Sequence, residues 1–192
     1  GQTYLDIVRT VKEAAPDIHI HAFSPLEIDQ GAATLQLPVS RFLEMLRDVG
    51  LRSMPGTAAE VLDEGVRSIL CPDKVTSQRW LDIMEQAHDV GLHSTATIMF
   101  GHVDDAGSWV RHWRQVLALQ QRTQGFTEVV PLPFVSEGAP IYRRGGSRPG
   151  PTWREALLMH AVLRLTLGHA IPNVQASWVK LGQQGALQML SA

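Results

Sequence analysis

The sequence predicts a single α/β domain over residues 1–192, built as part of a (β/α)8 TIM-type barrel. Segments with strand-like alternation take turns with segments of helical spacing, which is the pattern of a parallel sheet. Five strands and six helices fit into the 192 residues, whereas a closed eight-stranded barrel takes ~250 residues. No G-x-G-x-x-G turn follows a strand, which argues against a doubly wound nucleotide-binding sheet.

The first elements alternate clearly. A helix is expected at 4–15, where Tyr4, Val8, Val11 and Ala15 share one face and Pro16 stops it. The segment "IHIHAFS" at 18–24 then reads as a strand. A short amphipathic helix is expected at 40–50, with Ser40 as its cap and Gly50 as its stop.

The middle of the chain repeats the same alternation. A brief strand at 52–62 opens into a turn that contains glycine and threonine, and a strong helix at 76–92 is capped by Thr76 or Ser77 and ended by Gly91. The segment "STATIMFGH" at 94–102 predicts the next strand, and 106–125 predicts the next helix.

The last third completes the pattern. The strand at 126–135 is interrupted near its end by two prolines, and a loop rich in Gly, Pro and Arg follows at 136–151. A helix is expected at 152–169, a strand at 172–182, and the start of a helix at 183–192.

Composition narrows the function classes. The net charge is −2, with Lys and Arg scattered along the chain, which argues against a nucleic-acid partner. Cys71, the one cysteine, excludes an internal disulfide and a multi-cysteine metal site built from this chain alone. No apolar run approaches the ~20 residues of a membrane span, and the N-terminus is no signal peptide. A cytoplasmic location without membrane contact is therefore expected.

Several polar side chains are expected near the carboxyl ends of the strands, where barrel active sites lie, namely Ser24, Glu27, Thr57, Glu60, His102, Asp104 and Lys180. His19 and His21 lie two residues apart and so share one face of a strand. One interpretation makes them, with His102, the ligands of a metal-dependent hydrolase or aldolase. The other makes them hydrogen-bonding residues of a pocket, and the spacing alone leaves both open.

The phrases "HIHAFSPLEI", "MPGTAAEVLDEGVRSILCPDK", "STATIMFGHVD", "GFTEVVPLPFV" and "NVQASWVKLG" strongly resemble the radical S-adenosylmethionine (SAM) family of FO synthases. The resemblance is to the half that transfers the 4-hydroxybenzyl group of tyrosine to 5-amino-6-ribitylaminouracil in the biosynthesis of coenzyme F-420. The related radical SAM enzymes of the menaquinone (futalosine) pathway are the alternative.

This resemblance implies that the chain supplies strands three to seven of the barrel. A 4Fe–4S cluster and SAM are implied as cofactors, with the three cluster cysteines upstream of Gly1, so this fragment alone is expected to be inactive. Tyrosine and the ribitylaminouracil are the implied substrates. Fusion or association with the cyclising subunit of FO synthase is also implied.

The resemblance also implies site residues, although none with a catalytic role. "TIMFGHVD" at 97–104 is similar to the G-x-I-x-G-x-x-E pattern that supports the SAM adenine, matching at Gly101 with Asp104 in the place of Glu. Together with the end of the preceding strand, the implied SAM-binding set is Thr57, Glu60, Gly101 and Asp104. The implied substrate pocket is lined by His19, His21, Ser24, Glu27, His102, Gln175, Ser177 and Lys180.

Overall fold

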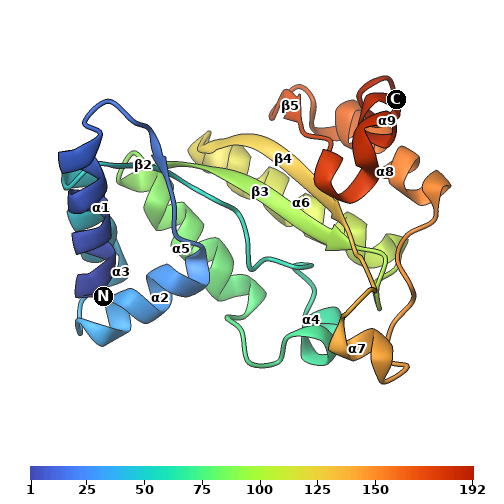
Figure 1. Ribbon diagram of the computed structural model, residues 1–192, viewed down its shortest axis with the longest axis horizontal. Helices are drawn as coiled ribbons and strands as arrows, with labels where there is room; N and C mark the ends of the chain where they lie inside the picture. Colours follow the sequence, from blue (N-terminus) through green and yellow to red (C-terminus); the bar gives the residue numbers. More distant parts are fainter.

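The computed structural model describes residues 1–192 as five strands and nine helices, with one or two helices between successive strands (Figure 1). The strands are β1 (Ile20–His21), β2 (Leu51–Met54), β3 (His93–Phe100), β4 (Phe126–Pro133) and β5 (Asn173–Val174). The helices are α1 (Gln2–Ala14), α2 (Pro25–Thr34), α3 (Val39–Asp48), α4 (Glu64–Leu70), α5 (Ser77–Asp89), α6 (Ala106–Thr123), α7 (Pro140–Arg143), α8 (Trp153–Leu167) and α9 (Trp178–Leu190). None of these helices is both long and apolar enough to cross a lipid bilayer.

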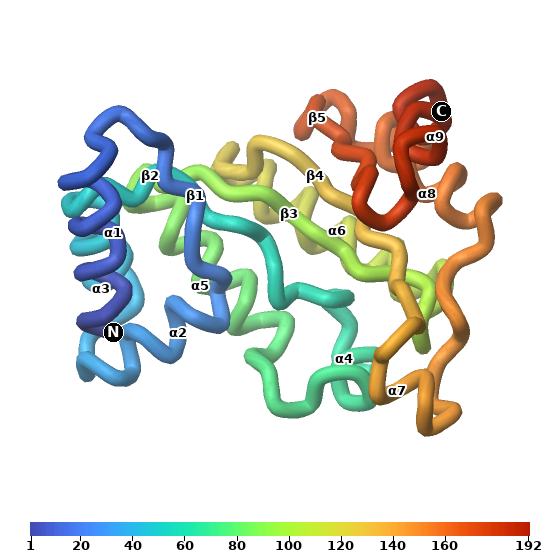
Figure 2. The backbone as a smooth tube through the Cα atoms, in the orientation of Figure 1, coloured from blue at the N-terminus to red at the C-terminus, as the bar shows by residue number.

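The five strands form one parallel sheet in strict chain order, β1-β2-β3-β4-β5. Figure 2 shows the chain crossing the sheet in this order, with α1 at one end and α9 at the other. A doubly wound sheet would reverse its strand order at a switch point, whereas consecutive neighbours are what a segment of a barrel gives. The prediction of a partial barrel is confirmed.

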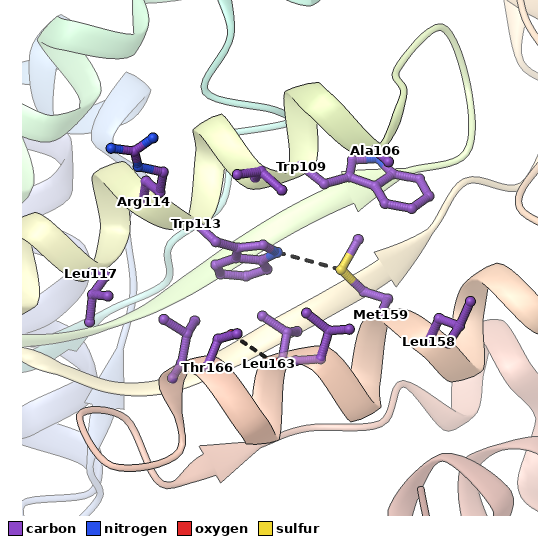
Figure 3. Close-up of a pocket in the computed structure, with 12 residues that line it drawn as sticks. Ala106, Trp109, Trp113, Arg114, Leu117, Leu158, Met159, Leu163 and Thr166 are labelled. Atoms are coloured by element: carbon purple, nitrogen blue, oxygen red, sulfur yellow. Dashed lines mark hydrogen bonds between the residues drawn. The ribbon is translucent and has the colours of Figure 1, made fainter.

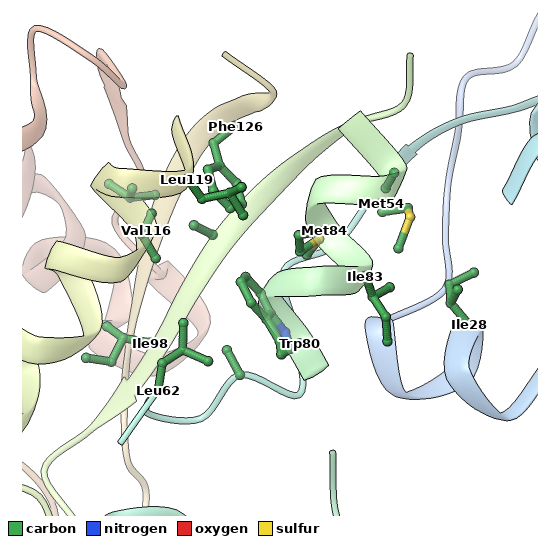
Figure 4. Close-up of a cluster of buried hydrophobic side chains, with 14 of the residues drawn as sticks. Ile28, Met54, Leu62, Trp80, Ile83, Met84, Ile98, Val116, Leu119 and Phe126 are labelled. Carbon is green, nitrogen blue, oxygen red and sulfur yellow. The ribbon is translucent and has the colours of Figure 1, made fainter. Parts of the chain in front are cut away.

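One face of the sheet packs against the helices. On β3, Ala96, Ile98 and Phe100 alternate along the strand and are fully buried in the core. Trp80 of α5 is fully buried in the same cluster, together with Leu62, Met84 and Ile98 (Figure 4). In Figure 1 helix α6 lies behind β3 and β4, so the view looks onto the opposite, inner face of the sheet.

Two short helices were not expected from the sequence, although their start signals are present. Ser24 caps α2 in a reciprocal capping box with Glu27, and Pro25 takes the first helical position. Asp63 caps α4 by accepting a hydrogen bond from the backbone of Val66 at 3.1 Å. The expected loop at 136–151 also contains the single turn α7.

Three boundary predictions were wrong. The strand expected at 18–24 shrinks to Ile20–His21, because Phe23 adopts left-handed backbone (φ 66°) just before the cap of α2. The strand expected at 172–182 pairs only over Asn173–Val174, since α9 begins at Trp178 and runs through a kink at Gly182. Helix α3 begins at Val39, so Ser40 lies inside its first turn and is no cap.

Candidate active site

The inner face of the sheet changes from polar to apolar along the strands. On β3 the side chains that alternate with the core residues are Thr95, Thr97 and Met99, and on β4 their register partners are Glu128, Val130 and Leu132. The strands therefore begin with a hydroxyl and a carboxylate and end with methionine and leucine.

A polar cavity of about 370 Å3 lies where the strands begin. No apolar residue lines it, and it draws on β1, β2, β3, β4 and the residues beside them: His19, His21, Arg52, Ser53, His93, Thr95, Thr127 and Glu128. We call these eight residues the polar pocket. The structure thus brings the two predicted histidines into one cavity, but at the amino ends of the strands rather than at the carboxyl ends.

The two histidines share one hydroxyl group. Ser53 Oγ lies 2.7 Å from His19 Nε2 and 2.7 Å from His21 Nδ1. A hydroxyl donates one proton, so it donates to one ring and accepts from the other. Burial lowers the pKa of His21, against an opposing effect of Glu128, and thus favours the neutral ring. Each ring keeps a second nitrogen, which donates or accepts according to the tautomer of that ring.

Glu128 is held in place by Gln175, one of the predicted pocket residues. Gln175 Nε2 donates to Glu128 Oε2 at 2.6 Å, while the Gln175 backbone donates to Val129 O at 3.0 Å. The contact orients a carboxylate of the polar pocket and leaves its Oε1 without a protein partner. Ser53, Glu128, Arg52 and His93 were missed at the sequence level, although period-two alternation from the core positions would have found those on the long strands.

The loop after β2 is clamped along β3, from Thr95 near its start to Met99 near its end. The backbone of Gly56 donates to Thr95 Oγ1 at 2.8 Å, and Met99 donates from its backbone to Glu60 O at 2.8 Å. A Cβ at Gly56 would lie 2.2 Å from Thr95 O, so only glycine permits this approach. Trp80 Nε1 donates to the carbonyl of Thr57 at 3.0 Å, which fixes the loop from the core side.

Strained backbone gathers near this end of the sheet. Phe23 after β1, and Ala58 and Glu60 after β2, have positive φ values of 66°, 60° and 48°. Such residues cluster where a site is preorganised. The Glu60 carboxylate forms an ion pair with Lys74 at 2.6 Å, and the Arg67 guanidinium, which is only 3% exposed, donates to Ala59 O and Val75 O.

Gly101, His102 and Asp104 are bound within the chain itself. The Asp104 carboxylate accepts from the backbone of Gly101 at 2.9 Å and of His102 at 2.6 Å, and from Trp109 Nε1. His102 is fully buried and donates from Nε2 to Met99 O, while its Nδ1 accepts from Val103 N. Burial lowers the pKa of His102, so the ring is neutral. A Cβ on Gly101 would meet Pro151 at 2.3 Å.

Four other predicted pocket residues do not line the polar pocket. The polar groups of Ser24 and Glu27 hydrogen-bond to each other in the capping box of α2, where Ser24 Oγ donates to Glu27 Oε2 at 2.7 Å. Ser177 and Lys180 lie at the start of α9 and are exposed or partly exposed. Their roles toward a ligand stay predictions without a contact that supports them.

The residues of this chain do not fit a metal ion or an iron–sulfur cluster. No three His, Cys, Asp or Glu side chains converge, so buried His102 does not join His19 and His21 as a ligand set. Cys71 is a lone buried thiol whose pKa is raised by burial, whereas cluster ligation takes several thiolates. The metal-dependent hydrolase or aldolase interpretation thereby loses its third ligand.

An apolar groove lies on the outer side of the sheet, between α6 and α8 (Figure 3). Trp113 of α6 spans it, with its indole N–H directed at Met159 Sδ 3.4 Å away. Val110 and Val162 on its rim are 57% and 49% exposed. The groove carries almost no polar group and belongs to the outer helix layer, apart from the polar pocket.

The fold and the site together define one class of protein, a parallel (β/α) barrel of which this chain forms a part, with a polar cavity on the inner face of the sheet. One solved structure with this fold is methylornithine synthase, with a TM-score of 0.71 and 19% identity, matched over 98% of this chain and 49% of that one. No protein-family model matches the chain.

Two kinds of relatives match almost the whole chain. The chain is 47% identical over 190 residues to FO synthase of Streptomyces coelicolor, covering 99% of this chain and 22% of that protein. It is 47% identical over 189 residues to 5-amino-6-(D-ribitylamino)uracil--L-tyrosine 4-hydroxyphenyl transferase of Methanopyrus kandleri, covering 98% of this chain and 51% of that protein. The chain is therefore homologous to one continuous segment of the FO synthases and of these transferases. It spans about half of the transferases and about a fifth of the FO synthases.

Proposed function

We propose that this chain is the central and C-terminal part of the barrel of a radical SAM enzyme of FO biosynthesis. The enzyme would couple the 4-hydroxybenzyl group of tyrosine to 5-amino-6-ribitylaminouracil. The observation that carries the proposal is the 47% identity, sustained over 98% of the chain, to a transferase whose name states both substrates. Because the FO synthases are much longer than this chain, the proposal includes fusion or association with the cyclising half. It also places the enzyme in the cytoplasm.

The proposed enzyme needs a 4Fe–4S cluster and SAM, which together supply a 5′-deoxyadenosyl radical when both are bound. Cys71, the lone buried thiol, does not fit cluster ligation, so the cluster ligands belong to another part of the enzyme. Toward SAM, we propose Thr57 and Glu60, because they lie in the strained, clamped loop after β2. Asp104 directs its carboxylate at Gly101 and Trp109, so we propose that Gly101 and Asp104 shape this end of the sheet without binding SAM directly.

The residues of the polar pocket and the inner face would bind and orient the two organic substrates. In this role the chain would position the substrates and exclude water, while the cofactors would supply the radical chemistry. The ordered hydrogen bonds around Ser53 and Glu128 support this role, since a preorganised polar surface orients a bound molecule at little cost in entropy.

The test is a chimera in which residues 1–192 replace the matching segment of the Methanopyrus kandleri transferase. After anaerobic loading with iron and sulfide, the chimera should form 5′-deoxyadenosine and the coupled adduct only when SAM, tyrosine and the ribitylaminouracil are all present. The unmodified transferase is the positive control, and iron content and circular dichroism establish that the chimera is folded and loaded. Deoxyadenosine formation that does not depend on tyrosine in a loaded chimera would refute the substrate assignment.

A further inference from the structure

We infer that the polar pocket is the subsite for the ribityl chain of the uracil substrate, with Ser53, His19, His21 and Glu128 as its hydrogen-bonding partners. This inference rests on the proposed function and deepens it. It assigns the open-chain polyol, rather than the tyrosine ring or the pyrimidine, to the amino ends of the strands.

The lining of the pocket selects the kind of ligand group. All eight of its residues are polar or charged, so every wall of the pocket offers hydrogen-bonding groups and none offers an apolar surface. The phenol ring of tyrosine would find no apolar wall there. A ribityl chain carries a hydroxyl group on almost every carbon and takes up hydrogen bonds along its whole length.

The hydrogen-bonding groups of the pocket match hydroxyl groups. Ser53 Oγ is shared at 2.7 Å by both histidines, so each ring keeps a second nitrogen that donates or accepts according to its tautomer. Glu128 adds the acceptor Oε1, since Gln175 occupies Oε2. A hydroxyl both donates and accepts, and this mixed set satisfies it in either role.

The position of the pocket fits the order of groups in the substrate. From Glu128 to Leu132 the inner face of β4 runs ~13 Å at ~3.3 Å per residue, and the lining becomes apolar on the way. A ribityl chain bound at Glu128 would direct the pyrimidine along this face toward the carboxyl ends of the strands, where barrel active sites are found.

The test compares two ligands on variants of the chimera described above. Calorimetry without SAM or tyrosine measures the Kd of 5-amino-6-ribitylaminouracil and of 5,6-diaminouracil, which lacks the polyol. Ser53→Ala and Glu128→Gln should each raise the Kd of the ribityl ligand about tenfold, the size of one lost hydrogen bond. Both variants should leave the Kd of diaminouracil and the KM of tyrosine within about twofold.

Ser68→Ala serves as the matched control, because Ser68 Oγ donates to Gly65 O at 3.0 Å within α4 and does not line the pocket. Equal weakening of both ligands by Ser53→Ala and Glu128→Gln, or no weakening of either, would overturn the ribityl assignment while the chimera still makes adduct. A loaded chimera with unmodified residues 1–192 that makes no adduct would instead refute the proposed function. Glu128→Gln keeps the shape of the side chain, so it tests the inference even if Ser53→Ala disturbs the fold.

Discussion

Replacing Asp104 by asparagine tests whether the end of β3 is held by one buried carboxylate. The Asp104 side chain is fully buried, and its Oδ1 accepts from the backbone of Gly101 and His102, while Oδ2 accepts from Trp109 Nε1. In Asp104→Asn, the best orientation keeps the two backbone contacts on the oxygen and turns the amide N–H groups toward the indole N–H. Two donors then face each other in a buried site.

The cost follows from these contacts. A hydrogen bond to a charged acceptor is worth ~1.5–3 kcal/mol, and a buried donor without a partner costs ~1–3 kcal/mol. We therefore expect Asp104→Asn to lower the free energy of unfolding by about 3–5 kcal/mol. Urea unfolding near neutral pH, followed by far-UV circular dichroism, measures the loss, provided that the m-values agree.

The adjacent residue provides a matched control. Asp105 caps α6 through a hydrogen bond from Ser108 N at 2.7 Å, and asparagine caps a helix about as well as aspartate. Asp105→Asn should change the free energy of unfolding by no more than ~0.5 kcal/mol. If the two variants differ by less than about 1 kcal/mol, the buried carboxylate does not hold the strand end in the way we describe.

Three more predictions concern the folded chain. Burial lowers the pKa of His112 to about 3 and the pKa of His88 to about 4. Near pH 5 these two rings are therefore protonated only in the unfolded chain, whose histidines have a pKa of ~6.5. The free energy of unfolding thus decreases as the pH drops below ~6.5, by about 2 kcal/mol per ring at pH 5. His112→Gln should remove about half of that loss in unfolding curves across pH, and an unchanged curve would contradict this. Gly56→Ala should lower the free energy of unfolding by ~3 kcal/mol, because the new methyl group overpacks against β3. Gly91→Ala should lower it by only ~1 kcal/mol, because φ is +83° there but the surrounding space is open. Equal decreases in melting temperature for the two variants would contradict the close contact at Gly56. Arg67→Met should lower the free energy of unfolding by ~3 kcal/mol and speed amide exchange in the 57–62 loop, since the carbonyls of Ala59 and Val75 lose their donor. Unaltered exchange would show that the guanidinium does not hold the loop.

The sequence predicted most of the fold because the long elements carry strong periodic patterns. Helices α5, α6 and α8 and strands β3 and β4 begin and end within three residues of their expected ranges, and Thr76 caps α5 as one of the two expected candidates. The errors lie where local pattern and tertiary context disagree. The segment 172–182 alternates like a strand, yet β4 pairs only with Asn173 and Val174, and α9 begins at Trp178.

The site was predicted less completely than the fold. His19 and His21 were expected on one face and share Ser53, and Gln175 reaches the same cavity through Glu128. His102 was expected in the pocket because it is polar, and nothing in the sequence indicates that the turn after β3 buries it completely. Ser53 and Glu128 were missed because a serine and a glutamate within a strand look like ordinary solvent-facing positions until the core face of that strand is known.

The strict chain order of the sheet bears on how the polypeptide folds during synthesis. Each strand hydrogen-bonds to the strand that precedes it, so every contact between strands closes one βα unit only. Such near-neighbour pairing keeps loop closure inexpensive and lets each unit dock as it leaves the ribosome. The sheet can therefore grow from its N-terminal side without waiting for the last helix.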